Sequence, residues 1–133
     1  MKRIIPALAL LLANAPAFAQ PRPADHVQTA AELAAICDPS TTGVPRLESI
    51  AYCQGFLTAA GQYHSLMNPP GRAVRQLFCV PNPGPTIAQS GIALARWVRE
   101  NPSHANEPAL DSMLRWAQAS FPCPVEPTSR RAR

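Results

Sequence analysis

The sequence predicts an all-α protein, a compact bundle of four to five helices held together by two intramolecular disulfides. Apolar residues recur every three or four positions in several segments, which is the period of an amphipathic helix, and no useful stretch alternates with period two. Proline- and glycine-rich stretches separate these segments and mark the turns between helices. The chain has four cysteines, an even number, as is typical of small disulfide-stapled domains.

The first 19 residues have the pattern of a secretory signal peptide. Lys2 and Arg3 precede an apolar run over residues 4–13, which is too short to span a bilayer. The tripeptide Ala-Phe-Ala at residues 17–19 is an A-x-A cleavage site. A short membrane anchor is the alternative, but no stop-transfer pattern follows the apolar run. We therefore expect export with cleavage near Ala19, after which no membrane attachment remains.

The exported chain divides into an extended leader at residues 20–28, one helical domain at residues 29–124 and a basic tail at residues 125–133. The formal net charge of the whole chain is +4, and loss of Lys2 and Arg3 lowers it to +2. No basic stripe with interleaved aromatic residues is present, so we expect no nucleic-acid partner.

Two helices are predicted in the first half of the domain. Thr29 and Glu32 have the spacing of a capping box, which predicts a short first helix that ends at Cys37. Pro45 stands where the first turn of a helix tolerates proline, and the longest helix follows over residues 46–67. The apolar stripes expected to face the core are Leu33, Ile36 and Cys37 in the first helix, and Leu47, Ile50, Cys53, Leu57, Ala60 and His64 in the second.

In the second half of the domain, residues 72–80 fit either a helical turn or a short extended segment, and we favour a short helix that runs into an irregular end. Two longer helices follow it. Thr86 and Gln89 repeat the capping-box spacing and begin a helix that closes near Asn101. The last helix ends before the sequence "PCP" at residues 122–124. The apolar stripes are Ile87, Gly91, Leu94 and Val98, and then Leu110, Met113, Leu114, Ala117 and Phe121.

Four cysteines can pair in three ways, and the expected packing of the helices favours one of them. The last two helices are joined by about six residues and should lie antiparallel, which brings Cys79 beside Cys123. A short loop after the first helix lets Cys53 of the second helix fold back onto Cys37. The favoured bridges are therefore Cys37–Cys53 and Cys79–Cys123, with crossed pairings as the alternative.

Three glycines in predicted helices should have a packing role. In the antiparallel arrangement Gly91 should make room for Trp116. Gly55 and Gly61 should allow close approach of neighbouring backbones, because glycine otherwise weakens a helix.

No catalytic set and no cofactor or metal site is evident, so we expect neither an enzyme nor a bound cofactor. His64 and Ser65 are adjacent on a helix and do not face each other. There is no C-x-x-C pair, and His26, His64 and His104 lack the spacing of metal ligands. We therefore favour disulfide bonds over metal binding as the role of the four cysteines. Binding through surface loops is the function that remains.

Four motifs occur in order along the chain: "YCQGFLTAAG" at residues 52–61, "FCVPNPGPTIAQ" at 78–89, "ARWVRENP" at 95–102 and "LRWAQASFPCP" at 114–124. They contain an aromatic-Cys-x-Gly-aromatic element, a Cys-x-Pro before a Thr-x-x-Gln helix start, a proline after the third main helix and a final Phe-Pro-Cys. Together they resemble the Rap/Tai-type immunity proteins of type VI secretion systems. The resemblance covers about residues 29–124, although "NPGPT" is richer in proline than the usual family turn.

The resemblance implies a periplasmic immunity protein with intramolecular disulfides. Such a protein binds a peptidoglycan amidase effector and blocks its papain-like Cys/His cleft sterically, with no chemistry of its own. Some members of the family act as dimers, so a homodimer is compatible with it. The best candidate contact residues are Ser103, His104, Asn106 and Glu107, for which an ordinary solvated loop is the alternative.

Two other functions fit the same disulfide-bonded helical scaffold. One is a periplasmic stress chaperone activated by acid, for which eight carboxylates make a poor sensor. The other is an orphan module that binds an unknown ligand of the cell envelope.

Overall fold

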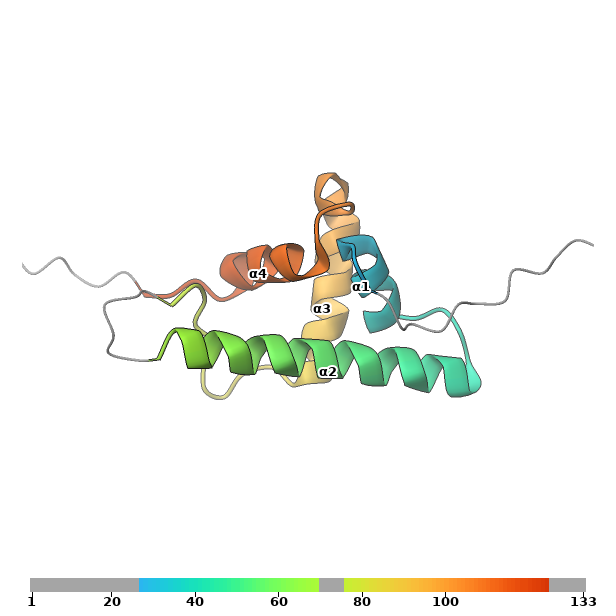
Figure 1. Cartoon of the computed structure of the whole chain (residues 1–133), viewed down its shortest axis with the longest axis horizontal. Helices are drawn as coiled ribbons and strands as arrows, with labels where there is room; N and C mark the ends of the chain where they lie inside the picture. Colours follow the sequence, from blue (N-terminus) through green and yellow to red (C-terminus); the bar gives the residue numbers. More distant parts are fainter. Residues whose placement is uncertain (1–26, 70–75, 125–133) are drawn as a thin grey trace, which may run out of the picture.

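The computed structural model describes residues 27–69 and 76–124, and in this part of the chain the architecture is all-α (Figure 1). The elements are α1 (Ala30–Cys37), α2 (Gly43–Met67), α3 (Ile87–Glu100), the 3₁₀ turn η1 (Pro102–His104) and α4 (Ala109–Ser120). The predicted fold class is therefore confirmed. The predicted signal peptide, most of the leader, the C-terminal tail and residues 70–75 lie outside the described residues.

Both predicted capping boxes are present. Thr29 Oγ1 accepts a hydrogen bond from the Glu32 backbone N–H, and the Glu32 carboxylate accepts one from the Thr29 N–H. Thr86 and Gln89 form the same reciprocal pair at the start of α3. Because each box satisfies two N–H groups that a helix leaves unpaired, α1 and α3 begin where the spacing predicted.

The long helix α2 begins three residues earlier than predicted, at Gly43. Gly43 has a φ of 66°, in the left-handed region that glycine adopts without strain. Pro45 lies in the first turn, as predicted, and the helix ends at Met67. At 1.5 Å per residue α2 is about 37 Å long, which makes it the longest described element.

The helices cross rather than forming a regular bundle. In Figure 1, α2 runs along one side of the molecule, α1 and α4 lie on the other side, and α3 runs between them. Helix α1 packs most closely against α3. Helix α4 runs across α3, so the expectation that the last two helices lie antiparallel was wrong (Figure 1).

The direction of α4 follows from backbone hydrogen bonds that join the α3–α4 connection to the start of α1. The Ala30 N–H donates to the Glu107 carbonyl at 2.9 Å, and the Ala31 N–H donates to the Ala105 carbonyl at 2.9 Å. The Ala109 N–H in turn donates to the Gln28 carbonyl at 2.8 Å. The connection is therefore held against α1, and α4 starts from there.

The core is small and is centred where α1 meets α3. Leu33 of α1 and Leu94 of α3 are fully buried, and α2 adds Cys53 and Leu57. The predicted stripes were partly wrong, because Leu47 is 66% exposed and Leu110 is 44% exposed. Leu47 lies on the first turns of α2, which extend beyond α1 (Figure 1). The crossing of α4 over α3 turns Met113 and Trp116 inward in place of Leu110.

Both favoured disulfides are present. Cys37–Cys53 joins the end of α1 to α2, and Cys79–Cys123 joins the segment before α3 to the segment after α4. The Cys79–Cys123 pairing was predicted correctly, although the antiparallel helix packing from which it was predicted does not occur. Residues 76–80 are irregular, as expected of the end of the predicted segment, and residues 72–75 lie outside the described residues. The Cys79 N–H donates to the Phe121 carbonyl at 2.8 Å. This irregular segment, and not an antiparallel helix pair, brings the two cysteines together.

Gly91 has a packing role, but not the predicted one. A Cβ atom at this position would lie 2.9 Å from Cys53 Sγ and 3.6 Å from Cys37 Cβ. Gly91 therefore makes room for the first disulfide and not for Trp116. The absence of a side chain lets α3 pack directly on the bridge between α1 and α2.

Candidate partner-binding surfaces

All four predicted contact residues lie in the connection between α3 and α4, residues 101–108, which we call the tip. The tip stands at the far end of α3 from α2 (Figure 1). Its backbone is a series of tight turns. The Asn101 side-chain amide donates to the Trp97 carbonyl at 2.8 Å, the His104 N–H to the Asn101 carbonyl and the Glu107 N–H to the His104 carbonyl, both at 3.0 Å.

The tip is also bonded to the first turn of α1. The first N–H groups of a helix have no partner within the helix, and here the carbonyls of residues 105 and 107 accept two of them. The tip and α1 therefore hold each other in place. Sequence spacing gave no sign of this contact, because it joins backbone groups more than 70 residues apart.

Two of the four predicted contact residues are engaged inside the tip. His104 Nδ1 lies 2.8 Å from Glu107 Oε1, and the imidazole ring stacks on Trp97. Arg115 Nε of α4 donates to Glu107 Oε2 at 3.2 Å. The hydrogen bond with His104 lowers the pKa of Glu107, and Arg115 lowers it further, so this carboxylate stays ionised and tied to both neighbours.

The other two, Ser103 and Asn106, are exposed. The structure thus brings all four residues together but gives them different surroundings. Ser103 and Asn106 present their side chains to solvent, whereas His104 and Glu107 hold the shape of the tip.

A second surface, which the sequence analysis missed, is a groove of about 670 Å³ between α2 and residues 76–87. The groove is lined by Leu57, Thr58, Gly61, Gln62, His64 and Ser65 of α2, and by Gln76, Phe78, Cys79, Val80 and Ile87 of the facing segment. One wall of the groove is an irregular segment, and irregular segments have no hydrophobic periodicity. The groove could therefore not be predicted from the sequence.

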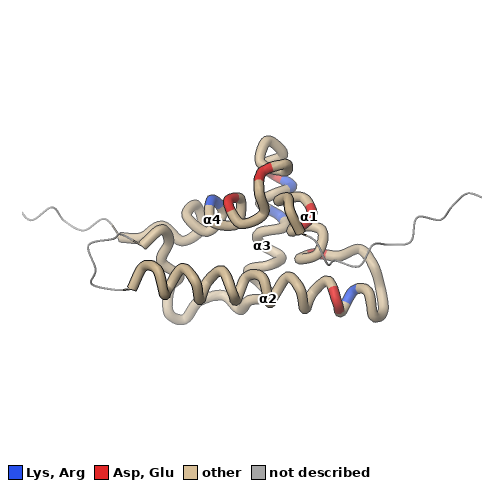
Figure 2. Tube along the Cα trace, in the orientation of Figure 1, with Lys and Arg blue, Asp and Glu red and all other residues tan. Residues whose placement is uncertain are grey.

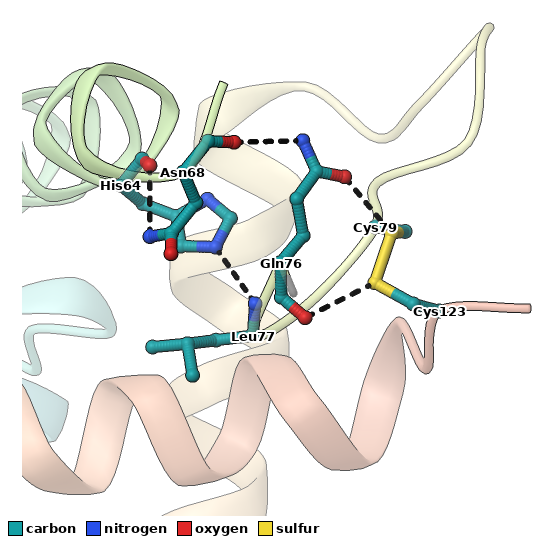
Figure 3. The surroundings of a disulfide bond; sticks show 6 residues. All are labelled: His64, Asn68, Gln76, Leu77, Cys79 and Cys123. Carbon is teal, nitrogen blue, oxygen red and sulfur yellow. Dashed lines mark hydrogen bonds between the residues drawn. A yellow bond between two sulfur atoms is a disulfide. The ribbon is translucent and has the colours of Figure 1, made fainter. Parts of the chain in front are cut away.

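His64 joins the two walls of the groove. Its Nε2 accepts a hydrogen bond from the Leu77 backbone N–H at 3.2 Å, as Figure 3 shows, and its ring stacks on Phe78 with a centroid distance of 4.0 Å. An Nε2 that accepts a hydrogen bond leaves the ring proton on Nδ1. Burial lowers the pKa of His64, so the ring is neutral. The histidine therefore packs as an uncharged residue, in agreement with the structural role expected of it.

The wall formed by residues 76–80 is fixed at two further points (Figure 3). The Gln76 side-chain amide donates to the Asn68 carbonyl at 3.2 Å, which ties the wall to the end of α2. The Cys79–Cys123 disulfide ties it to the end of α4. The two dashed lines in Figure 3 that join Gln76 to sulfur atoms are close contacts, because disulfide sulfurs carry no proton. The groove is thus held open by covalent and hydrogen bonds.

Among the described residues, the walls of the groove carry no formal charge; Arg72 and Arg75, in the segment that joins the two walls, lie outside the described residues. Residues 49–69 and 76–95 contain no Asp, Glu, Lys or Arg. In Figure 2 the described charged residues lie on and just after α1, at the start of α2, on the far part of α3, in the tip and on α4. The tip is therefore polar and ionic, whereas the described lining of the groove is uncharged.

Residues 29–123 match the family model of the Rap1a immunity proteins. The chain belongs to the Rap1a immunity protein family. The family suggested by the four motifs is thus confirmed, and the match spans both disulfides, the tip and the groove. No curated protein and no solved structure matches the chain.

The described part of this Rap1a protein holds no group of three side chains able to bind a metal ion and no free cysteine. No described helix has both the length and the apolar character needed to cross a membrane. Within that part, two surfaces bring distant segments of the chain together, the tip and the groove.

Two glycines of α2 do not have the packing role predicted for them. A Cβ atom added at Gly55 or at Gly61 would meet nothing within 4 Å, so no neighbouring backbone of the described chain approaches either residue. Gly55 is exposed, whereas Gly61 lines the groove. The space beside Gly61 is therefore open toward the outside of the molecule.

Proposed function

We propose that this Rap1a protein is a periplasmic immunity protein that binds a peptidoglycan amidase effector of a type VI secretion system and inhibits it sterically. Membership of a family of immunity proteins carries the proposal. Periplasmic location is supported by the signal-peptide pattern at residues 1–19 and by two disulfides, which persist in oxidising compartments. The amidase as target follows from the resemblance to the Rap/Tai-type proteins.

The tip is the surface we assign to the effector. Ser103 and Asn106 are exposed on it, and the bonds among His104, Glu107 and Arg115 fix its shape before binding. A preformed loop loses little conformational entropy on association, which favours tight binding. A rigid tip of this kind can fill the cleft of an enzyme, and inhibition then needs no chemical step.

The proposal is tested with the mature chain, residues 20–133, purified with its disulfides intact. The partner in the assay is a purified peptidoglycan amidase effector of a type VI secretion system. We expect one-to-one inhibition of peptidoglycan hydrolysis and binding measurable by calorimetry. Failure to bind or inhibit that amidase would contradict the proposal, and suppression of aggregation at pH 3 in its place would favour the chaperone.

The tip has its own test. We expect Ser103→Tyr and Asn106→Tyr each to weaken inhibition at least tenfold, because a bulky side chain at an interface core disrupts its fit. The melting temperature should not change, since both positions are exposed. Ala93→Tyr, at an exposed position of α3 outside the tip, is the matched control. Equal inhibition by all three variants would remove the tip from the interface.

A further inference from the structure

We propose that the outer face of α2 is a homodimer interface, in which two copies of the chain pack these helices antiparallel about a two-fold axis at Gly55. The outer face is the line of residues 44, 48, 51, 55, 59, 62 and 66, together with residues 47 and 63 beside it. This interface goes beyond the proposed function, because its occupant is a second copy of the chain and not the effector.

The outer face has no partner within the described chain. Residues three and four positions apart share one side of a helix, and every residue of the outer face is exposed. A Cβ atom added at Gly55, in the middle of the line, would meet nothing within 4 Å. The buried residues of α2, which are Cys53, Leu57 and His64, lie on the opposite side of the helix. Helix α2 thus packs one side against the protein and leaves the other side uncovered.

Large apolar side chains lie near both ends of the outer face. Val44 and Leu47 are 65% and 66% exposed, and Tyr63 and Leu66 are 62% and 75% exposed. At 1.5 Å per residue the two pairs lie about 24 Å apart along the helix. An occupant that covers both pairs must be long and straight and carry apolar groups near both of its ends. A second copy of α2 has this shape and this chemistry.

Antiparallel pairing about Gly55 matches the residues of the two copies by kind. In such a pair, a residue that precedes Gly55 faces the residue that follows Gly55 by the same number of positions in the second copy. Val44 then meets Leu66 of the second copy, and Ala51 meets Ala59 of the second copy. Apolar side chains therefore meet at the ends of the interface, and small side chains meet in its middle.

The sizes of these residues fit two crossing helices. Ala51, Gly55 and Ala59 stand one turn apart and carry at most a methyl group. Packed helices have axes about 8–10 Å apart, and the distance depends on the side chains at the contact. Two straight helices that cross at a small angle are closest at the crossing point and separate toward their ends. Small residues in the middle and large ones at the ends therefore place the crossing at Gly55.

The charge on the outer face selects the antiparallel direction. Glu48 is its one charged residue. Antiparallel pairing sets Glu48 opposite Gln62 of the second copy, whose side-chain amide can donate a hydrogen bond to the carboxylate. Parallel pairing would set the two Glu48 carboxylates against each other, which is unfavourable. Arg72 and Arg75 follow α2, beyond the last residue of the outer face, and lie outside the described residues.

The outer face is large enough for a stable dimer. At roughly 100 Å² of exposed surface for each of the four large side chains, two copies bring together about 800 Å², and the smaller residues between them raise the total above the about 1,000 Å² that a specific interface needs. The tip stands at the far end of α3 from α2, so both tips stay free in the dimer (Figure 1).

The test compares two glycines of the same helix in analytical ultracentrifugation of the mature chain. We expect the wild type to be a dimer. Gly55→Arg places two bulky like charges at the axis and should weaken the dimer at least tenfold, whereas Gly61→Arg, outside the outer face, should stay within threefold of wild type. Both positions have open space in the single chain, and unchanged circular dichroism shows that both variants fold.

Cross-linking tests the direction of the pairing. Gly55→Cys should form a disulfide between two copies, because this position meets itself at the axis. Val44→Cys should not, because in the antiparallel pair its two copies lie about 33 Å apart along the helix, far beyond the reach of a disulfide. A Val44→Cys chain that cross-links as readily as Gly55→Cys would indicate parallel helices and would overturn this inference.

Two further outcomes would also overturn it. One is a wild type that stays monomeric at every concentration, and the other is a dimer that Gly55→Arg leaves intact. None of these measurements uses the effector, so their failure leaves the proposed function standing. Because the tips stay free, a monomeric Gly55→Arg chain should still inhibit the amidase one to one; an amidase that binds neither chain contradicts the proposed function and leaves the dimer standing.

Discussion

Gly91→Ala should destabilise the protein, although the same change elsewhere in a helix stabilises it. The added methyl carbon would lie 2.9 Å from Cys53 Sγ, closer than carbon and sulfur normally approach. The sulfur cannot move away freely, because the disulfide ties it to α1 as well as α2. Overpacking of this kind costs about 2 kcal/mol, and the helix gains about 1 kcal/mol when alanine replaces glycine. The net expectation is a loss of about 1 kcal/mol.

Gly55→Ala is the matched control for this prediction. Gly55 is a helix residue with nothing within 4 Å of an added Cβ, so only the helix-propensity gain of about 1 kcal/mol applies. The free energies of unfolding of the two variants should therefore differ by about 2 kcal/mol. For a domain of this size, 1 kcal/mol corresponds to roughly 4–8 °C in melting temperature.

The assay is thermal and urea unfolding of the mature chain without reductant, followed by circular dichroism. If Gly91→Ala raises the free energy of unfolding as much as Gly55→Ala does, the proposed contact between α3 and the Cys37–Cys53 bridge does not restrict this site. A folded Cys37→Ala/Cys53→Ala background gives a second check, because Gly91→Ala should become stabilising there.

Three further predictions concern stability. Burial lowers the pKa of His64 in the folded state, so the contribution of this residue to the free energy of unfolding is complete above the pKa of an unfolded histidine, about 6.5, and is lost as the pH falls below it. Urea unfolding between pH 8 and pH 4 should show this loss for the wild type and not for His64→Gln. Ser112→Ala should stabilise by about 1 kcal/mol in thermal unfolding, because the buried Ser112 Oγ has no hydrogen-bond partner among the described residues. Cys79→Ala/Cys123→Ala should lose about 4 kcal/mol, the chain-entropy value for cysteines 44 residues apart, and an unchanged urea midpoint would refute this value.

The features that could be predicted from the sequence are local or countable. The capping boxes at Thr29 and Thr86 depend on residues three positions apart, so their spacing alone located the starts of α1 and α3. The even number of cysteines indicated two bridges, and the short loop after α1 favoured Cys37–Cys53; Cys79–Cys123 was predicted from an antiparallel packing that does not occur.

The features that could not be predicted depend on contacts between distant residues. The direction of α4 is set by hydrogen bonds from the Ala30 and Ala31 N–H groups to carbonyls of the α3–α4 connection. The spacing of apolar residues in the sequence does not predict such backbone bonds. For the same reason Leu110 was wrongly assigned to the core, and Trp116, although buried as expected, does not pack where Gly91 leaves room. The tip could be located because it is a loop, whereas the groove has one irregular wall that no periodicity reveals.

The exposed apolar surface of α2 shows why this fold needs covalent links. Val44, Leu47 and Leu66 are large apolar side chains that remain mostly in solvent, so the longest helix contributes less burial than its length allows. Helices in proteins are stabilised mainly by packing of an apolar face, and here only the part of α2 from Cys53 onward supplies one. The two disulfides, worth about 3 and 4 kcal/mol by chain entropy, are comparable to the whole net stability of a small domain.

This balance links the binding surfaces to the compartment. The Cys79–Cys123 bridge fixes one wall of the groove, and the Cys37–Cys53 bridge fixes α1, whose first turn holds the tip. Reduction of both bridges would therefore remove the rigidity of both surfaces along with most of the stability of the fold. A chain built in this way can present a preformed tip only where disulfides persist, so we expect the proposed binding to be lost when both bridges are reduced.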